Sequence, residues 1–168
     1  VDPPYGIGES GGSESRNRVA TNNYERKEWD KNAPDADYFI ELQRVSKNQI
    51  VWGGNYFVEF LKNSRCWLIW SKPERGFSLS EAELAWTSFD KVVRVFDHYR
   101  NEIGRNHPTQ KPVKLYEWIL TNYAKEGDKI LDTHLGSGSN AIAALNMGFE
   151  FTGIEIDEDY YTASLESI

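Results

Sequence analysis

The stretch from Lys129 to Asp157 constrains the fold more than any other part of the 168-residue chain. A short apolar run ends in Asp132, and a turn that contains Gly136 and Gly138 follows it. A helix of small residues comes next, and then a second apolar run carries Glu155, roughly 20 residues beyond the first glycine. This order of strand, glycine turn, helix and strand, with an acid at this spacing, predicts a nucleotide-binding βαβ unit.

The residue types in this unit suit close contact with a ligand. Glycine has no Cβ, so the backbone can turn tightly and a ligand can approach it. Three alanines, Ala141, Ala143 and Ala144, allow the helix to pack close to the sheet. Glu155, at the end of the second strand, is placed to accept hydrogen bonds from ribose hydroxyls. The alternative is an ordinary strand-to-helix turn with an unrelated acid nearby.

Composition excludes several classes of protein. Hydrophobic residues at 39% and charged residues at 27% are ordinary for a globular domain, and no apolar run approaches the length of a membrane span. A single cysteine, Cys66, excludes an internal disulfide and suits a reducing cytoplasm. The histidines lack metal-ligand spacing with one another or with Cys66, so we expect no metal site. A net charge of -7 argues against a protein that simply coats polyanions.

The rest of the chain predicts helices and strands around one core, in a single domain. Residues 6–34 show no periodicity, and we expect them to form a long flexible loop. The expected elements are, in order, a helix capped by Asp35 or Asp37, a strand at Gln49–Trp52, a helix from Asn55 to about Leu61, a strand at Arg65–Trp70, two strands at Leu84–Phe89 and Val92–Phe96 that could pair with each other, and a helix between Pro112 and Gly127.

Two prolines stiffen the backbone of the segment Asp2–Tyr5 and remove two amide donors. The neighbouring carbonyls and the Asp2 carboxylate are therefore available to accept hydrogen bonds from a ligand, and Tyr5 adds a flat ring. A carboxylate, a carbonyl and a stacking ring together suit a planar group that bears an exocyclic amine. The alternative is a stiff, polyproline-like entry into the following loop.

The segment His107–Pro112 leads into the helix that begins near Pro112. One interpretation places the amides and polar side chains of Thr109, Gln110 and Lys111 beside a ligand carboxylate. The other interpretation is a well-capped amphipathic helix that packs on the core.

Taken together, these motifs resemble the DNA amino-methyltransferases that depend on S-adenosylmethionine, in the order typical of their beta class. The segment Asp2–Tyr5 looks like the catalytic motif, and Asp132, Gly136 and Gly138 look like the cofactor loop. Glu155 looks like the acid that holds the cofactor ribose. The site residues that the resemblance implies are Asp2, Pro3, Pro4 and Tyr5 for catalysis, and Thr109, Gln110, Lys111, Asp132, His134, Gly136, Ser137, Gly138, Glu155 and Asp157 for the cofactor.

Two positions differ from the family pattern: His134 stands where Phe is more common, and Ser139-Asn140 stands where a Thr pair is usual. The resemblance implies the Rossmann-like α/β fold of class I methyltransferases, a three-layer sandwich around a mostly parallel sheet. It also implies that residues 1–168 form a single methyltransferase domain. Within it, residues 1–5 are the catalytic motif, 6–34 a flexible loop, 72–106 a short target-recognition segment and 107–168 the cofactor-binding part.

The resemblance also implies a central strand that ends at Asp2 and lies between the strands at Ile130–Asp132 and Gln49–Trp52. Only Val1 precedes Asp2, so we expect this strand to be missing from the N-terminus and to belong to a reading frame longer by about 20–30 residues. Without it, two inner strand edges would lack hydrogen-bond partners.

The implied activity is methyl transfer from S-adenosylmethionine to the exocyclic N6 of adenine in double-stranded DNA, in the cytoplasm of a bacterial or phage-infected cell. Three alternatives stay open: cytosine N4 as the target, a nucleic-acid-binding module without turnover, and an NAD-dependent oxidoreductase, because residues 136–141 also fit a dinucleotide fingerprint. The expected partner is double-stranded DNA, with no membrane and no metal, and a homodimer is left open.

Overall fold

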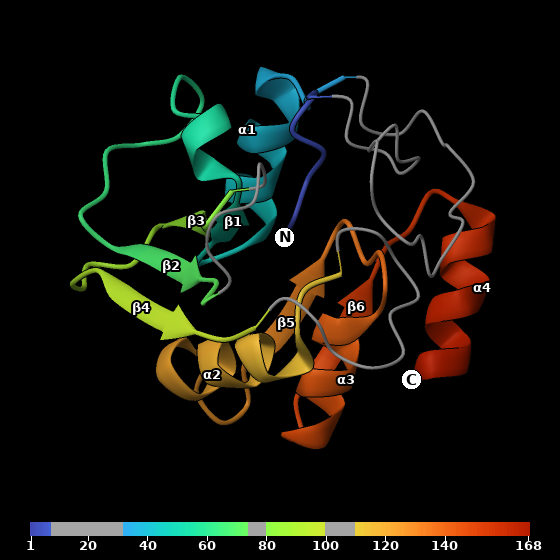
Figure 1. The fold of residues 1–168 in the computed structure, drawn as a ribbon. Coiled ribbons are helices and arrows are strands. Elements are labelled where there is room, and N and C mark those ends of the chain that lie inside the picture. Colours follow the sequence, from blue (N-terminus) through green and yellow to red (C-terminus); the bar gives the residue numbers. More distant parts are fainter. Residues whose placement is uncertain (8–31, 74–79, 100–109) are drawn as a thin grey trace, which may run out of the picture.

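The computed structural model describes residues 1–7, 32–73, 80–99 and 110–168. Figure 1 shows two groups of elements that meet near the N-terminus: a four-stranded sheet with α1 against it, and a βαβ unit with α4 beside it. Within the described ranges no helix is both long enough and apolar enough to cross a membrane. The elements are, in order, α1 (Ala36–Val45), β1 (Ile50–Trp52), a short 3₁₀ helix η1 (Gly54–Tyr56), β2 (Trp67–Ser71), β3 (Ala82–Thr87), β4 (Arg94–Asp97), α2 (Val113–Tyr123), β5 (Lys129–Asp132), α3 (Ser139–Asn146), β6 (Glu150–Gly153) and α4 (Glu158–Ser167).

The strands β1 to β4 form a mixed sheet in the order β1-β3-β2-β4. β3 is antiparallel to both β1 and β2, whereas β4 runs parallel to β2. The expectation of a mostly parallel sheet is therefore wrong for this group. Residues 72–81, which join β2 to β3, are too few for the crossover of about a dozen or more residues that parallel neighbours need.

The expected pairing of Leu84–Phe89 with Val92–Phe96 is also wrong, because β2 lies between β3 and β4. β2 pairs with β3 along its whole length and with β4 from Leu68 to Ser71. Leu68 and Trp70 of β2 are fully buried. β2 therefore takes an inner position, where both of its edges are paired and these side chains are covered.

Two helix predictions had different outcomes. α1 begins as expected, with the Asp35 carboxylate accepting the amide of Tyr38 at 3.2 Å. The helix expected from Asn55 to about Leu61 is wrong, because the helical part is confined to η1. Phe57 leaves helical geometry at φ -119° and ψ 18° and is fully buried, with its ring centroid 5.2 Å from that of Phe39. Tertiary packing of this ring overrides the local helical pattern.

The sheet has a core on each face. Toward α1, Val51 of β1 and Trp86 of β3 pack with Phe39. On the opposite face, Trp52 and Ala85 pack with α2 and α3. Adjacent residues of one strand thus enter different cores, as the alternation of side chains along a strand requires. The helix α2 contributes one face to this second core, which includes Leu115, Ile119 and Tyr123.

The βαβ unit predicted from the sequence is confirmed. β5 and β6 pair in parallel, and α3 connects them and packs against α2. β6 ends at Gly153, so Glu155 lies just beyond the strand. The sequence pattern therefore located both strands and the helix, and placed the acid close to the correct strand end.

Val1 lies beside β1. Its terminal ammonium donates to the Ile50 carbonyl at 2.9 Å, and its carbonyl accepts the Trp52 amide at 3.0 Å. This is the hydrogen-bond pattern of a parallel pair, with Val1 opposite Val51. Within the part of the chain that the structure describes, β5 and β6 pair with each other alone. The strand expected between β1 and β5 stays a prediction.

Candidate active site

The segment Asp2–Tyr5 folds back on itself, because the Tyr5 hydroxyl donates to Asp2 Oδ1 at 2.8 Å. The Tyr5 ring stacks on Tyr56 of η1, with 4.9 Å between centroids and 17° between planes. It also lies directly on Gly53, where an added Cβ would come within 2.1 Å of the ring. Pro3 is buried, which anchors the segment. The expected catalytic residues therefore form one compact unit, and Tyr56 is a neighbour that the sequence pattern did not indicate.

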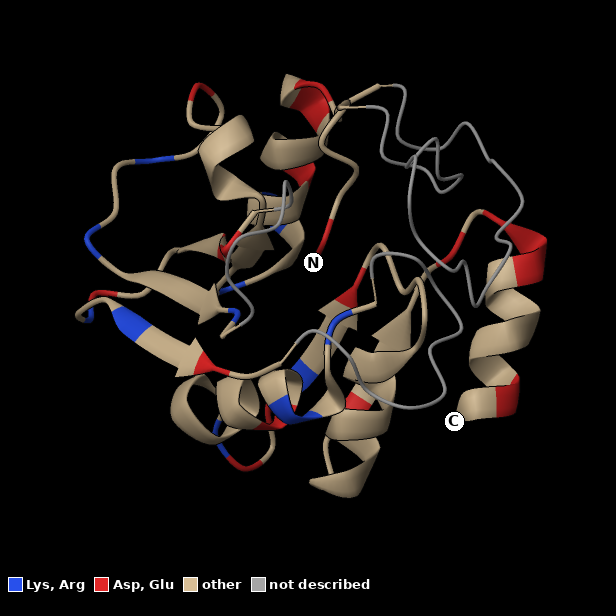
Figure 2. Cartoon of the chain, in the orientation of Figure 1, with Lys and Arg blue, Asp and Glu red and all other residues tan. Residues whose placement is uncertain are grey.

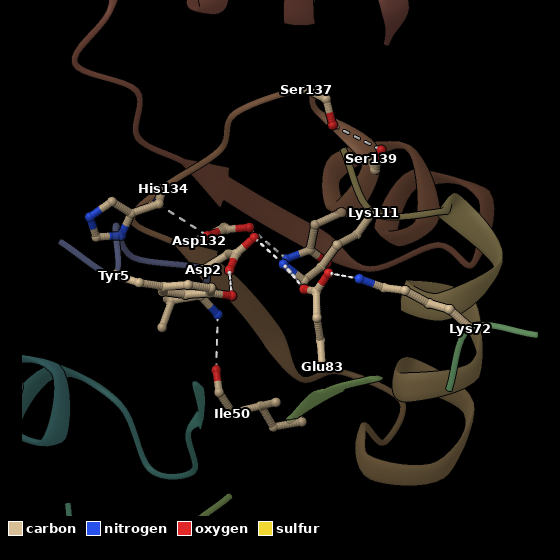
Figure 3. Close-up of polar contacts among 12 residues, drawn as sticks. Asp2, Tyr5, Ile50, Lys72, Glu83, Lys111, Asp132, His134, Ser137 and Ser139 are labelled. Atoms are coloured by element: carbon tan, nitrogen blue, oxygen red, sulfur yellow. Dashed lines mark hydrogen bonds and ion pairs between the residues drawn. The ribbon is translucent and has the colours of Figure 1, made fainter. Parts of the chain in front are cut away.

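Lys111 reaches this unit from the segment before α2. Its Nζ donates to Asp2 Oδ2 and lies 3.0 Å from Glu83 Oε2, and its side chain is only 3% exposed (Figure 3). Burial alone would lower the pKa of Lys111, but the charges of Asp2 and Glu83 outweigh it and raise that pKa. The ammonium therefore stays charged. One interpretation of the sequence placed Lys111 beside a ligand carboxylate, whereas in the structure its side chain contacts two carboxylates of the chain itself.

Glu83 of β3 accepts from two lysines. Its Oε1 accepts from Lys72 Nζ, and its Oε2 faces Lys111 (Figure 3). Burial would raise the pKa of Glu83, but Lys111 and Lys72 lower it to about 2. Neither Glu83 nor Lys72 was among the predicted site residues. The available signal was that Glu83 lies within one apolar strand and Lys72 directly follows another. Charged residues at such positions are rarely buried unless they are paired.

The glycine turn is held by Glu155. The Gly136 amide donates to Glu155 Oε2 at 2.8 Å, and the Asp157 amide donates to Oε1 at 3.0 Å. Gly136 has φ +53°, in the left-handed region, and a Cβ added there would meet nothing within 4 Å. The backbone of the turn is thus open to approach on this side, as a ligand-binding glycine turn requires.

Asp132 is 2% exposed at the end of β5 and organises the start of the turn. Its Oδ1 accepts the His134 amide at 3.1 Å, and its Oδ2 accepts from the Asn140 side chain at 2.8 Å. Asn140, which departs from the family pattern, therefore satisfies a buried carboxylate oxygen. Both oxygens of Asp132 have partners in the chain, so Asp132 shapes the turn from within.

His134 lies between the turn and α1. Its ring is 5.4 Å from that of Tyr38 in an edge-to-face arrangement, and the Tyr38 hydroxyl is 2.8 Å from Thr133 Oγ1. Burial lowers the pKa of His134, which favours the neutral ring, and burial raises the pKa of Tyr38 to about 12. Both groups are therefore neutral near pH 7 and form a wall of the site.

Two adjacent residues connect the glycine turn to the N-terminal segment. The side-chain amide of Gln110 donates to Ser139 Oγ at 3.4 Å, and the side chain of Lys111 donates to Asp2. Ser139 Oγ in turn lies 3.0 Å from Ser137 Oγ. The structure thus brings together two motifs that are more than a hundred residues apart in the chain.

Two of the predicted cofactor residues have other outcomes. Thr109 lies outside the described residues. Asp157 caps α4, because its Oδ1 accepts the amides of Asp159 and Tyr160 at 3.0 and 3.1 Å. Among the described residues, no group of His, Cys, Asp and Glu has the arrangement of a metal site. The arrangement as a whole offers an open backbone turn, carboxylate acceptors and an aromatic stack.

A sequence model of the family described as DNA methylase matches residues 62–166. Among curated proteins, the chain is similar to the type II methyltransferase M2.DpnII of Streptococcus pneumoniae, with 46% identity over 54 residues. It is also similar to the type II methyltransferase M.HpaI of Haemophilus parainfluenzae, with 35% identity over 71 residues. These alignments cover 32% and 42% of this chain but only 20% and 23% of the two relatives, less than a quarter of their length.

Solved structures share the fold. The M1.HpyAVI–SAM complex matches with a TM-score of 0.63 at 21% sequence identity, over 84% of this chain and 86% of that chain. TTHA0409 of Thermus thermophilus, complexed with S-adenosyl-L-methionine, matches with a TM-score of 0.51 at 16% identity, over 78% and 76% of the two chains. These TM-scores show a common Rossmann-like α/β fold, and at identities this low the comparison concerns the fold alone.

Proposed function

The chain belongs to the family of N6/N4 DNA methylases, and we propose that it transfers a methyl group from S-adenosylmethionine to N6 of adenine in double-stranded DNA. The observation that carries this proposal is the junction at Gln110 and Lys111, whose side chains contact Ser139 and Asp2 respectively. A turn suited to a nucleoside and a segment suited to an exocyclic amine are thereby neighbours. A role in restriction–modification belongs to the same proposal, since two relatives are named type II methyltransferases.

The glycine turn fits the adenosyl part of the cofactor. The open side of Gly136 lets a ligand approach the backbone. Each oxygen of Glu155 accepts one amide, which leaves further lone pairs for ribose hydroxyls. The hydroxyls of Ser137 and Ser139 add polar groups near the turn. When bound, S-adenosylmethionine supplies an electrophilic methyl group.

Asp2 and the carbonyl of Pro3 serve the target amine. The lone pair of an exocyclic amine is delocalised into the ring of the base, which makes the nitrogen a poor nucleophile. Asp2 and the Pro3 carbonyl would accept hydrogen bonds from its two N–H groups, which favours a pyramidal nitrogen whose lone pair points at the methyl group. As the nitrogen–carbon bond forms, the bond between the methyl carbon and sulfur would break, and the nitrogen would then lose one proton to solvent. Tyr5 stacks on the base. Catalysis then rests on positioning and on fixed dipoles.

Access of the target base to Asp2 and Tyr5 requires that the base leave the duplex, at roughly a few kcal/mol. Figure 2 shows acidic residues on α4, which carries Glu158, Asp159 and Glu166 and no Lys or Arg. Phosphates are repelled from such a surface. We therefore expect DNA to approach from the side of Tyr5 and the half-exposed Tyr56, away from α4.

Adenine is favoured over cytosine by the first residue of the catalytic motif. The resemblance associates Asp at this position with adenine N6, whereas the enzymes that methylate cytosine N4 more often have Ser there. Asp2 therefore supports the adenine assignment.

The test is methyl transfer from labelled S-adenosylmethionine to unmethylated duplex DNA, followed by mass spectrometry of the nucleosides. We expect N6-methyladenine from the wild-type chain. Asp2→Ala should abolish transfer while the cofactor Kd changes by less than about threefold, because Lys111 keeps Glu83 as a partner and the glycine turn is intact. The matched control is Glu150→Gln, which removes a carboxylate from an exposed ion pair with Lys129 and should leave transfer unchanged.

Three results would contradict this proposal. N4-methylcytosine as the product would replace adenine by cytosine as the target. Cofactor binding without any methylated product would indicate a nucleic-acid-binding module, and near-normal transfer by Asp2→Ala would remove Asp2 from the catalytic role.

A further inference from the structure

We propose that Glu83 on β3 is a positioning residue for methyl transfer, which acts on the catalytic Asp2 through the buried ammonium of Lys111. This inference rests on the proposed function. It adds a residue that lies in the four-stranded sheet, outside both the N-terminal motif and the glycine turn.

The geometry forms a continuous chain of charges. Lys72 donates to Glu83 Oε1, Lys111 bridges Glu83 Oε2 and Asp2 Oδ2, and Tyr5 donates to Asp2 Oδ1 (Figure 3). Two cations and two anions alternate, so the group is neutral as a whole. The side chains of Lys111 and Lys72 are 3% and 6% exposed, and that of Glu83 is 24% exposed. Solvent screening between these charges is therefore weak.

The position of the Lys111 ammonium depends on Glu83. A lysine side chain has four rotatable carbons and a compact charge, and nothing in its own covalent structure orients the three N–H groups. One of them points to Asp2 and another to Glu83, and the ammonium also lies 5.2 Å from the centre of the Trp52 ring. Two anionic partners on different elements therefore hold the nitrogen at one point.

The position of the Asp2 carboxylate depends in turn on Lys111. Asp2 precedes two prolines, and its side chain is held at one oxygen by Lys111 and at the other by Tyr5. A carboxylate fixed at both oxygens presents its remaining lone pairs in set directions. Loss of Glu83 would let the Lys111 ammonium move toward Asp2, and the acceptor directions offered to the amine would change.

A competing interpretation treats Glu83 as a structural ion pair that merely stabilises β3. That interpretation predicts a loss of stability without a specific loss of kcat, and it predicts that the effects of Glu83 and Lys111 on kcat are independent. A double-mutant cycle separates the two interpretations, because residues that act as a unit show non-additive losses.

The experiment measures kcat, the KM for DNA, the cofactor Kd and thermal unfolding for wild type, Glu83→Gln, Lys111→Met and the double variant. We expect Glu83→Gln to lower kcat roughly 10- to 100-fold, with KM and Kd within about twofold, since a small misplacement of a catalytic group has effects of this size. Lys111→Met should lower kcat at least as much. In the double variant, kcat should lie within about twofold of that of Lys111→Met alone.

Glu150→Gln is again the matched control, because it removes a carboxylate from the exposed pair with Lys129. If Glu83→Gln does not fold, Lys72→Met loosens Glu83 from its other side. It should lower kcat in the wild-type background and have no further effect in the Lys111→Met background.

The outcomes separate this inference from the proposed function. If Glu83→Gln keeps the wild-type kcat, or if the loss of kcat in the double variant equals the product of the two single losses, the positioning role of Glu83 is overturned. The proposed function would stand in either case. A wild-type chain that transfers no methyl group would overturn the proposed function, and the role of Glu83 with it.

Discussion

The two groups of elements that meet at the site bury different types of residue. Around β1 to β4, the cores are aromatic, with Trp52, Trp70 and Trp86 at most 3% exposed. Around β5 and β6, the buried helix residues are small, as at Ala143 and Ala144, which are fully buried. Large rings in one group fill the space on both faces of the sheet, and small side chains in the other let α3 pack close to its neighbours.

The two groups owe their order to different interactions. The sheet of β1 to β4 is fixed by apolar burial and can carry a buried ion cluster on one face. The βαβ group is ordered at its ligand-facing end by polar contacts. Asp132 and Glu155 each bind two groups of the chain there. A nucleoside site needs exposed backbone and acceptors, and a dense aromatic core would cover them.

The largest effect should follow from damage to an aromatic core. Trp86→Ala on β3 should lower the free energy of unfolding by about 3–5 kcal/mol, as for other buried Trp residues. Ala144→Gly on α3 should lower it by only about 1 kcal/mol, because it removes one methyl group from a helix. Urea unfolding of both variants measures the contrast. Equal losses would mean that the two groups depend alike on apolar packing.

The ion cluster should make stability depend on pH. The folded-state pKa of Glu83 is about 2, below its ordinary value of 4.5, so its contribution is complete above pH 4.5 and is lost as pH falls toward 2. We expect the free energy of unfolding of the wild type to exceed that of Glu83→Gln by on the order of 2–3 kcal/mol near neutral pH. That difference should shrink between pH 4.5 and 2 in urea unfolding curves. A difference that does not vary with pH would show that the charge of Glu83 is not involved.

Glu155 should control cofactor binding. Glu155→Ala should weaken binding of S-adenosylmethionine by about 1.5–3 kcal/mol, the range for lost hydrogen bonds to a charged group. The same change removes the acceptor of the Gly136 amide, so the turn itself should loosen. Isothermal titration calorimetry measures the affinity. An unchanged Kd would place the cofactor ribose elsewhere.

The smallest effect should separate a helix cap from a ligand contact. Asp157→Ala should lower the free energy of unfolding by about 1 kcal/mol and leave the cofactor Kd unchanged, because its Oδ1 caps α4. Asp35→Ala removes the equivalent cap of α1 and is the matched control. Cofactor binding that weakens in Asp157→Ala as much as in Glu155→Ala would restore Asp157 to the cofactor site, where sequence reasoning first put it.

Local sequence signals were sufficient to predict the local units of this protein. Glycines at fixed offsets, a run of alanines and the acid at Glu155 predicted the βαβ unit, because each of these signals acts within a few turns of the chain. The cap at Asp35 and the buried face of α2 were predictable for the same reason. The resemblance to DNA methylases depended on the order of such local motifs, and the match over residues 62–166 confirmed it.

Which charges come into contact depends on the tertiary packing. Asp2, Glu83 and Lys111 are far apart in the sequence, and no spacing rule connects them. Their contact depends on the strand order β1-β3-β2-β4, which puts β3 inside the sheet, and that order differs from the one expected. Strand order depends on the burial of all strands together. Charged side chains from distant parts of the chain come into contact only when the strands are packed in that order.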